Sequence, residues 1–214
     1  MDVAISIQNV YKTFKGEQVL CNVNHDFETG KIHGVVGNNG SGKTVLFKCI
    51  CGFMLPTKGK IFCDYQQVGV DIDFPDDLGL IIESPGFLLA KSGYKNLEII
   101  ASLKRKIGDK EICYAINRVG LDPASRKPVS KYSLGMRQRL GIAQAIMENP
   151  SLLILDEPFN GLDKDMVEKM RFLLKELRQE GKTILLASHN GVDIDELCDT
   201  VCEMDGGILT VTKK

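Results

Sequence analysis

Short apolar runs alternate with amphipathic segments along the first and last parts of the chain. Ile32–Val36 is a β-type run. Leu152–Leu155 and Thr183–Ala187 are apolar on successive positions, which is typical of central strands buried on both faces of a parallel sheet. Asp165–Gln179 instead has apolar residues at three- and four-residue spacing, which indicates an amphipathic helix. This alternation predicts an α/β core.

The middle of the chain has helical spacing only, and glycines and prolines interrupt it. The predicted helices are Tyr94–Lys106, Lys110–Val119 and Leu134–Met147. We therefore expect one domain over residues 1–214, in which 1–83 and 151–214 form the α/β core and about 84–150 form an inserted helical lobe.

The composition is that of an ordinary folded protein, with 43% hydrophobic and 26% charged residues and a net charge of −1. This balance gives no general attraction to nucleic acid or to an anionic bilayer, so we expect no nucleic-acid partner. The longest apolar runs are too short to cross a membrane, and the first residues lack the features of a secretory signal. These properties predict a cytoplasmic location.

Seven scattered cysteines agree with a reducing compartment, where buried thiols are the ordinary state. Cys198 and Cys202 are spaced so that they could share a helix face. Two thiols without further cysteine or histidine partners fall short of a four-ligand zinc site, so the sequence favours reduced thiols over a metal role.

Residues 37–44 read Gly-Asn-Asn-Gly-Ser-Gly-Lys-Thr, which fits the phosphate-loop pattern in full and lies between a predicted strand and a predicted helix. Glycines allow successive backbone N–H groups to curl around a phosphate. Lys43 is expected to reach the β- and γ-phosphates, and Thr44 to offer its hydroxyl to Mg²⁺. The candidate nucleotide-binding residues here are Asn38, Asn39, Gly40, Ser41, Gly42, Lys43 and Thr44.

Two acids follow the apolar strand at residues 152–155. Asp156 would lie at the carboxyl edge of the sheet, where open α/β sheets bind ligands, and it is a candidate to hold Mg²⁺. Glu157 is placed to act as the base toward an attacking water. An acidic pair at a strand end is commonly a solvated turn, but its position downstream of a phosphate loop favours catalysis.

Two further segments carry candidate chemistry. Ser133 is a natural N-cap for the helix that continues through Arg139. His189 follows the third apolar strand, where strand ends meet the predicted site, and we expect it to contact the γ-phosphate.

Together these motifs resemble the nucleotide-binding domain of ATP-binding-cassette (ABC) ATPases over nearly the whole chain. The glycine loop resembles the Walker A motif, Leu152–Glu157 the Walker B motif with its catalytic glutamate, and Gly161–Asp163 the D-loop. His189 corresponds to the switch histidine, and Ser133–Arg139 to the family signature. The resemblance implies a P-loop NTPase core with an antiparallel β region and an inserted helical lobe, and it implies that Phe14 stacks on adenine. Phe14 could instead be a core aromatic beside a turn.

The resemblance also implies a mechanism. Two such domains face each other head to tail, and each ATP with its Mg²⁺ lies between one phosphate loop and the other subunit's signature helix. Ser133 and the backbone of Gly135 would contact the partner's γ-phosphate, so we expect a homodimer in the presence of ATP. Lys43, Glu157 and His189 are the expected catalytic residues.

Two positions differ from the common family pattern. Glu83 ends the strand predicted in the segment from Leu78, at the position where most ABC ATPases have a glutamine, and it is a further candidate Mg²⁺ ligand. Leu134 and Met136 replace a glycine and a polar residue of the signature. Both differences resemble the ATPase subunits of exporters for peptide antibiotics, of the bacitracin and lantibiotic type.

A transporter of this type needs a membrane pore, so the resemblance implies separate permease chains. The ATPase would then contact the membrane only through the permease, at its inner face. Phe87, Leu88 and Leu89 are the expected permease contact, as a partly exposed apolar patch. The same three residues could instead anchor the helical lobe.

Other readings stay open from the sequence alone. They are an ABC-type ATPase that moves no substrate, a small P-loop kinase, and a nucleotide-binding module without hydrolysis. The chain has a single cassette and no sustained heptads, which disfavours an ABC-type ATPase that moves no substrate. A small P-loop kinase would not explain the signature segment or His189. The joint presence of Lys43, Asp156 and Glu157 disfavours a module without hydrolysis.

Overall fold

The predicted apolar runs form the centre of a six-stranded sheet. A computed structural model describes residues 2–83 and 85–213 of the chain. The strand order is β10-β9-β3-β8-β7-β6, and all neighbouring pairs are parallel except β10 with β9. The strands are β3 (Ile32–Val36), β6 (Leu78–Ile81), β7 (Leu152–Asp156), β8 (Thr183–Ala187), β9 (Thr200–Asp205) and β10 (Ile208–Lys213).

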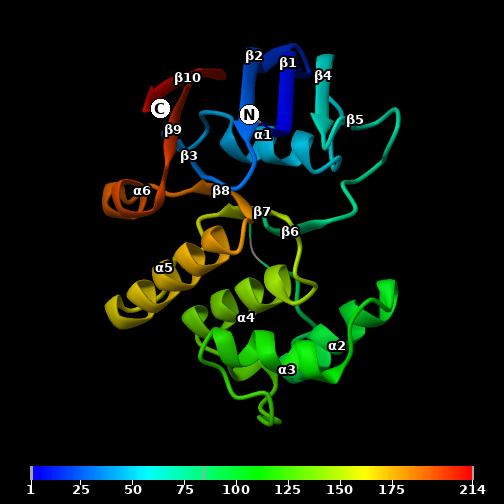
Figure 1. Cartoon of the computed structure of the whole chain (residues 1–214), viewed down its shortest axis with the longest axis vertical. Helices are drawn as coiled ribbons and strands as arrows, with labels where there is room; N and C mark the ends of the chain where they lie inside the picture. Colours follow the sequence, from blue (N-terminus) through cyan, green and yellow to red (C-terminus); the bar gives the residue numbers. More distant parts are fainter. Residues whose placement is uncertain (1, 84, 214) are drawn as a thin grey trace.

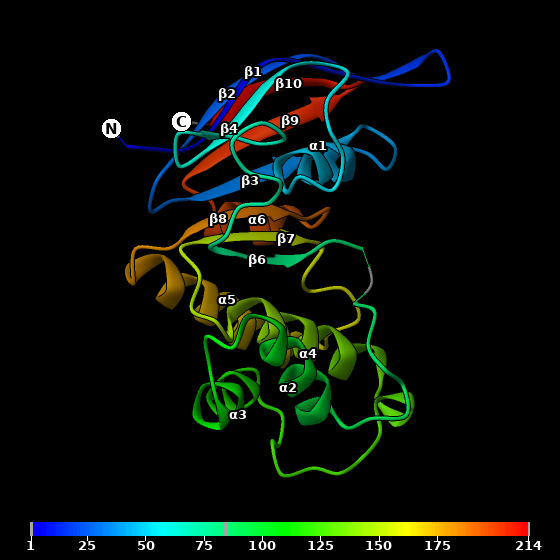
Figure 2. The ribbon, with the colours of Figure 1, turned by 90° about the vertical axis from the view of Figure 1, so that its right-hand side faces the viewer.

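A second, antiparallel sheet covers one side of the first, and α1 (Lys43–Ile50) lies between them (Figures 1 and 2). Its strand order is β2-β1-β4-β5. These strands are β1 (Val3–Phe14), β2 (Glu17–Glu28), β4 (Lys58–Cys63) and β5 (Gln66–Gln67).

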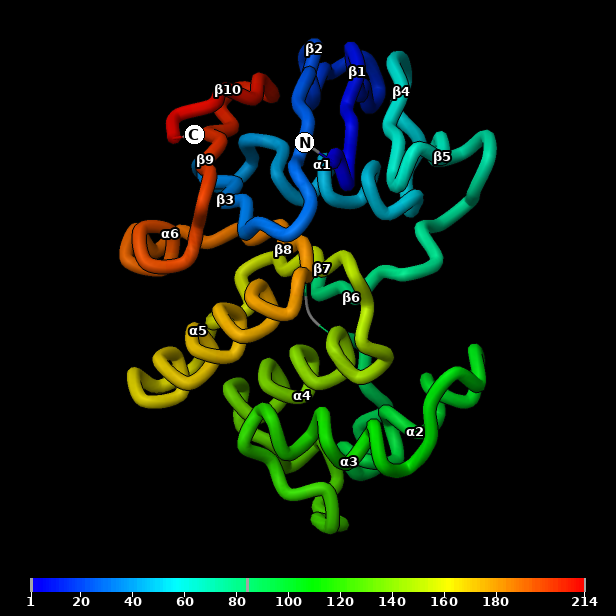
Figure 3. Tube along the Cα trace, in the orientation of Figure 1, coloured from blue at the N-terminus to red at the C-terminus, as the bar shows by residue number. Residues whose placement is uncertain are grey.

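The remaining helices contribute to the hydrophobic core on the opposite side of the six-stranded sheet, where Figure 2 shows the longer ones. They are α2 (Gly93–Lys104), α3 (Asp109–Arg118), the 3₁₀ turn η1 (Val129–Lys131), α4 (Leu134–Ile146), α5 (Lys164–Gln179) and α6 (Gly191–Leu197). Both ends of the chain lie near the antiparallel sheet, away from α2, α3 and α4 (Figure 3). Among residues 2–83 and 85–213, no helix combines the length and apolar character needed to cross a membrane.

Alternate residues of the central strands enter two separate hydrophobic cores. In β7, Leu153 and Leu155 pack with the helical side, whereas Leu152 and Ile154 pack with α1 and the antiparallel sheet. All five residues of β7 and of β8 are buried. The apolar runs thus form central parallel strands, as their pattern predicts, because both faces of the sheet are covered.

The expected helices in the middle of the chain are confirmed, and their ends differ from the prediction by at most two residues. The prediction for Phe87 is wrong in part. Its side chain is only 9% exposed and belongs to the helical-side core, so it anchors the helices. Leu88 and Leu89 are 52% and 56% exposed. Asn96 holds the backbone of Leu88 in place. Its side chain accepts a hydrogen bond from the Leu88 N–H and donates one to the Leu88 carbonyl.

All seven cysteines are free, and burial makes most of them unreactive. Burial raises the pKa of Cys49 and Cys202 to about 11 and that of Cys51, Cys63 and Cys198 to about 12. The suggested helix face shared by Cys198 and Cys202 is wrong, because Cys198 ends α6 whereas Cys202 lies in β9.

Candidate functional site

The backbone conformation of the glycine loop between β3 and α1 requires glycine at two positions. Gly37 and Gly42 adopt positive φ angles of 144° and 111°. A Cβ at Gly37 would lie 2.1 Å from the Met204 carbonyl oxygen, so no other residue fits beside β9. Gly40 also has a positive φ, of 83°, but a Cβ there would meet nothing within 4 Å, so this side of the loop is open.

The polar groups of the loop fit an anion. The Ser41 hydroxyl is buried and has no hydrogen-bond partner among the described residues. Lys43 is 8% exposed, and its ammonium donates hydrogen bonds to the carbonyls of Gly37 and Asn38 at 2.6 and 3.1 Å. In the described structure no acidic side chain lies in the first turn of α1 and no side chain caps it, so its N–H groups are available to a phosphate.

Asp156, the last residue of β7, meets the phosphate-loop helix directly. Its Oδ2 accepts a hydrogen bond of 2.7 Å from the Thr44 hydroxyl. Asp156 is 8% exposed, so a carboxylate and a hydroxyl oxygen adjoin in a largely buried place. Oxygen atoms of this kind are the ligands that Mg²⁺ prefers.

Glu157 is held by three contacts at the carboxyl end of β7. Its backbone N–H donates to the Ala187 carbonyl at 2.9 Å, and its carbonyl accepts from the side chain of Gln138 at 3.1 Å. Its carboxylate lies 2.7 Å from Nδ1 of His189, which follows β8. The side chain of Glu157 is 24% exposed and that of His189 is 70% exposed. A carboxylate and an imidazole thus form a pair at the edge of the sheet, as general acid–base chemistry requires.

A cavity of about 580 Å³ joins the loop to these acids. Nine of the residues predicted for the site line it: Asn39, Gly40, Ser41, Gly42, Lys43, Thr44, Glu83, Asp156 and Glu157. Leu134 and Gln138 from the start of α4 also line it, as does Asn160 after Glu157. The contributions of Gln138 and Asn160 were not predicted from the sequence. The only indication there is their position, Gln138 within the signature segment and Asn160 shortly after the Walker B motif.

Other predicted residues lie outside this cavity. Phe14 ends β1 with 39% of its surface exposed, and the Lys12 ammonium lies 5.2 Å from its ring centre. It is therefore neither a core aromatic nor part of the cavity wall. The Asn38 side chain does not line the cavity either. His189 reaches the site only through its contact with Glu157.

Glu83 does not end a strand as expected, because β6 stops at Ile81. Glu83 has a positive φ of 60°, and its carboxylate accepts a 2.6 Å hydrogen bond from the Lys48 ammonium of α1. Lys48 was not predicted as part of the site. One indication of this role was present in the sequence: Lys48 lies four residues after Thr44, so the two residues share one face of the helix.

The segment that resembles the ABC signature begins α4. Ser133 is the N-cap, and its hydroxyl accepts a hydrogen bond from the Met136 N–H at 3.2 Å. Ser133 is exposed and lies outside the wall of its own chain's cavity. Gly135 packs against the D-loop so closely that a Cβ there would lie 2.7 Å from the Gly161 carbonyl oxygen.

Comparison with known proteins agrees with this geometry. The ABC transporter family model matches residues 20–160. The chain is 42% identical to an uncharacterized ABC transporter ATP-binding protein, YybJ of Bacillus subtilis, over 98% of this chain and 96% of that protein. It is 39% identical to the bacitracin transport ATP-binding protein BcrA of Enterococcus faecalis, over 98% of this chain and 68% of that protein.

Two further similarities concern transport and assembly. The lantibiotic transport ATP-binding protein SrtF of Streptococcus pyogenes is 34% identical over 92% of this chain and 85% of that protein. A dimeric structure of a bacterial ABC transporter cassette superposes with a TM-score of 0.88 and 25% identity, over 98% of each chain. These similarities and the matched family model favour the ABC ATPase over the small P-loop kinase. The chain belongs to the ABC transporter family, as an ATP-binding subunit that hydrolyses ATP.

Proposed function

We propose that this chain is the motor subunit of an ABC exporter for peptide antibiotics and that two copies of it enclose each ATP. The observation that carries the proposal is the meeting of Thr44, Asp156, Glu157 and His189 at the mouth of the phosphate loop. The similarity to BcrA and SrtF supports the choice of exported substrate. The motor would act at the inner face of the membrane, bound to separate permease chains.

Each residue of the site then has a separate task. The loop from Asn38 to Thr44 binds the phosphates, with Lys43 as the cation for the β- and γ-phosphates. Thr44, Asp156 and Glu83 would hold Mg²⁺, which neutralises charge on the phosphate oxygens when bound.

Hydrolysis needs a base and a group that orients it. Glu157 is positioned to take the proton of the attacking water, and the Nδ1 atom of His189 holds the Glu157 carboxylate at 2.7 Å. Phe14 is exposed at the end of β1, and a flat ring is able to stack on adenine.

The exposed position of Ser133 supports an enclosure made by two copies. A helix start with a hydroxyl cap favours an anion, yet Ser133 lies outside its own chain's cavity wall. In a head-to-tail pair, Ser133 and Gly135 of one copy would contact the γ-phosphate held by the other. ATP then favours the dimer, and hydrolysis releases it.

Complementation between two inactive variants tests this arrangement. Lys43→Ala removes a charge-assisted contact worth about 1.5–3 kcal/mol, so its own loop fails. Ser133→Asp keeps a good N-cap but places a negative charge against the partner's γ-phosphate. Each variant alone should hydrolyse little ATP, but their mixture should recover activity, because one site of the mixed dimer has an intact loop and an intact signature.

The matched control mixes Lys43→Ala with Glu157→Gln. Both substitutions damage the loop side, so every site of that mixed dimer is defective and no activity should return. Absence of recovery in the first mixture as well, measured as phosphate release, would reject the shared site.

The exposed pair Leu88 and Leu89 is the proposed permease contact, since Phe87 is buried. Asn96 fixes the Leu88 backbone, so both side chains are presented from a rigid segment. We expect cells with the Leu88→Asp/Leu89→Asp variant to be as sensitive to peptide antibiotics as a gene deletion, while the purified variant still hydrolyses ATP. Ile208→Asp, on the exposed edge strand β10, is the control and should keep resistance. Unchanged sensitivity of the deletion strain to every peptide antibiotic tested would contradict the proposed substrate.

A further inference from the structure

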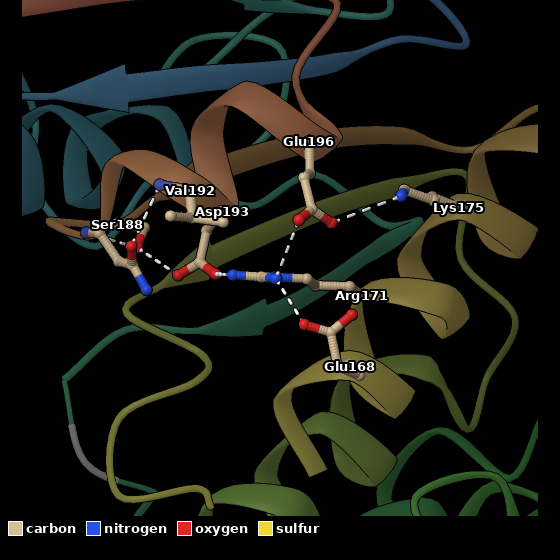
Figure 4. Close-up of polar contacts among 8 residues, drawn as sticks. Glu168, Arg171, Lys175, Ser188, Val192, Asp193 and Glu196 are labelled. Atoms are coloured by element: carbon tan, nitrogen blue, oxygen red, sulfur yellow. Dashed lines mark hydrogen bonds and ion pairs between the residues drawn. The ribbon is translucent and has the colours of Figure 1, made fainter. Parts of the chain in front are cut away.

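A buried ion pair joins α5 to α6 close to the switch histidine. Arg171 of α5 and Asp193 of α6 are 5% and 2% exposed. The guanidinium donates to Oδ1 of Asp193 from Nε at 2.9 Å and from Nη2 at 2.5 Å (Figure 4). A charged pair this deeply buried requires nearly complete hydrogen bonding to persist.

The second oxygen of Asp193 reaches the segment that carries His189. The Ser188 hydroxyl, 4% exposed, donates to Oδ2 of Asp193 at 2.9 Å. The same hydroxyl accepts a hydrogen bond from the Asn190 N–H at 3.1 Å. The residues on both sides of His189 are therefore tied to one buried carboxylate, while the His189 side chain itself is largely exposed and contacts Glu157.

Two outer carboxylates complete the surroundings of Arg171. Its Nη1 donates to Glu168 at 2.7 Å and to Glu196 at 3.3 Å, and Lys175 lies 3.8 Å from Glu196 at the exposed end (Figure 4). Burial alone would lower the pKa of Arg171, but the hydrogen bond to Asp193 and the charges of Asp193, Glu196 and Glu168 raise it. The guanidinium thus remains charged beside the carboxylate of Asp193.

The helix that carries Arg171 begins at the D-loop. Asp163 caps α5, and its side chain accepts a hydrogen bond from the Met166 N–H. Gly161, two residues earlier, packs against Leu134 and Gly135 at the start of α4. One rigid helix therefore connects the segment beside the signature to the buried pair beside His189.

We propose that Arg171, Asp193 and Ser188 are positioning residues that hold His189 against Glu157. The inference rests on the proposed role of His189 in hydrolysis. Arg171 orients Asp193, Asp193 orients the Ser188 hydroxyl, and that hydroxyl fixes the backbone on either side of the imidazole. None of the three touches the nucleotide cavity wall.

The test uses Ser188→Ala and Asp193→Asn, because Arg171→Ala would leave a buried carboxylate unpaired and unfold the chain. Only three histidines are present, His25, His33 and His189, so their ring signals are separable by NMR. We expect the His189 signal to move in both variants while those of His25 and His33 stay in place. Lys175→Met is the matched control and should move none, because it removes only an exposed ion pair.

Steady-state hydrolysis gives the second readout. Loss of one buried hydrogen bond should lower kcat about fivefold in Ser188→Ala, with the KM for ATP unchanged. The double variant Ser188→Ala/His189→Ala should be no slower than His189→Ala alone, because the hydroxyl acts through the imidazole. If Ser188 had only a structural role, Ser188→Ala would lower kcat by a similar factor in the parent chain and in the His189→Ala chain.

The two readouts separate the inference from the proposed function. An unmoved His189 signal in both folded variants would overturn the positioning role. A moved signal with unchanged kcat would leave the positioning role intact and remove His189 from the proposed chemistry.

Discussion

Glu157 and Glu83 both adopt left-handed backbone conformations, with φ of 53° and 60°. For residues other than glycine such conformations cost on the order of 1–3 kcal/mol each and persist where the surroundings enforce them. At Glu157 the enforcing contacts are those from its N–H to Ala187 and from Gln138 to its carbonyl. The sequence predicts both residues as acids of the site, but it carries no signal for their backbone conformation.

The pairing of Glu83 with Lys48 explains how the chain accepts a carboxylate in the cavity wall. The ammonium lies 2.6 Å from the carboxylate and opposes its negative charge. Without Lys48, that charge would act on the phosphates through the shared cavity.

We expect Lys48→Met to weaken ATP binding about two- to fivefold, because the pair is partly exposed and its contribution is small. Glu83→Gln in the same chain should restore the affinity, since it removes the unopposed charge. Equilibrium binding of a fluorescent ATP analogue measures both effects. Equal affinities in Lys48→Met and the parent chain would show that the pair has no electrostatic role.

At the scale of elements, the strands and helices with strong periodicity were predicted closely. β3 and β8 have the predicted bounds, and α3 is shifted by one residue at each end. The resemblance implied an antiparallel β region, but the bounds of β1 and β2 were not predicted, because these half-exposed strands alternate irregularly and contain register shifts. α6 was not predicted, because a segment of seven residues is too short for its hydrophobic periodicity to distinguish a helix from a turn.

His33 of β3 joins three strands through its ring. Nε2 lies 2.8 Å from the Glu28 carbonyl at the end of β2, which fixes a proton there, and Nδ1 lies 2.6 Å from the Thr200 hydroxyl of β9. The ring is 1% exposed, and burial lowers the pKa of His33 below its ordinary value of 6.5.

This shift predicts acid sensitivity of the fold. A lowered pKa means that the unfolded chain binds more protons, so stability falls as the pH drops from 6.5 through the folded-state pKa of His33. The midpoint of urea unfolding should therefore decrease over this range in the parent chain. His33→Gln should reduce the decrease, and His189→Ala, which alters an exposed ring, should not. An identical pH dependence in His33→Gln would exclude His33 as the cause.

At the scale of the molecule, the nucleotide-binding face combines elements from distant parts of the sequence. The phosphate loop, the end of β7 and the start of α4 all border one cavity. The motifs predicted most of this face, because each motif fixes its own chemistry locally. They could not predict the contacts between motifs, such as Lys48 with Glu83, Leu134 with Gly161, or Arg171 with Asp193, which depend on how the elements pack.

The division into an α/β core and a helical lobe stays a prediction. The helices α2, α3 and α4 lie together on one side of the six-stranded sheet, and α4 packs against β6 through the helical-side core (Figure 2). In the proposed head-to-tail pair, the exposed Ser133 at the start of α4 would face the second copy.

The shared enclosure of ATP is tested most directly by the molar mass of Glu157→Gln in solution. This variant loses the base but keeps the loop, so ATP and Mg²⁺ should accumulate uncleaved and hold two copies together. Light scattering on a sizing column should give twice the mass of the 23.7 kDa chain with ATP and a single mass with ADP. Glu180→Gln, an exposed glutamate at the end of α5, is the control and should be monomeric with either nucleotide. A Glu157→Gln chain saturated with ATP that remains monomeric would contradict the account.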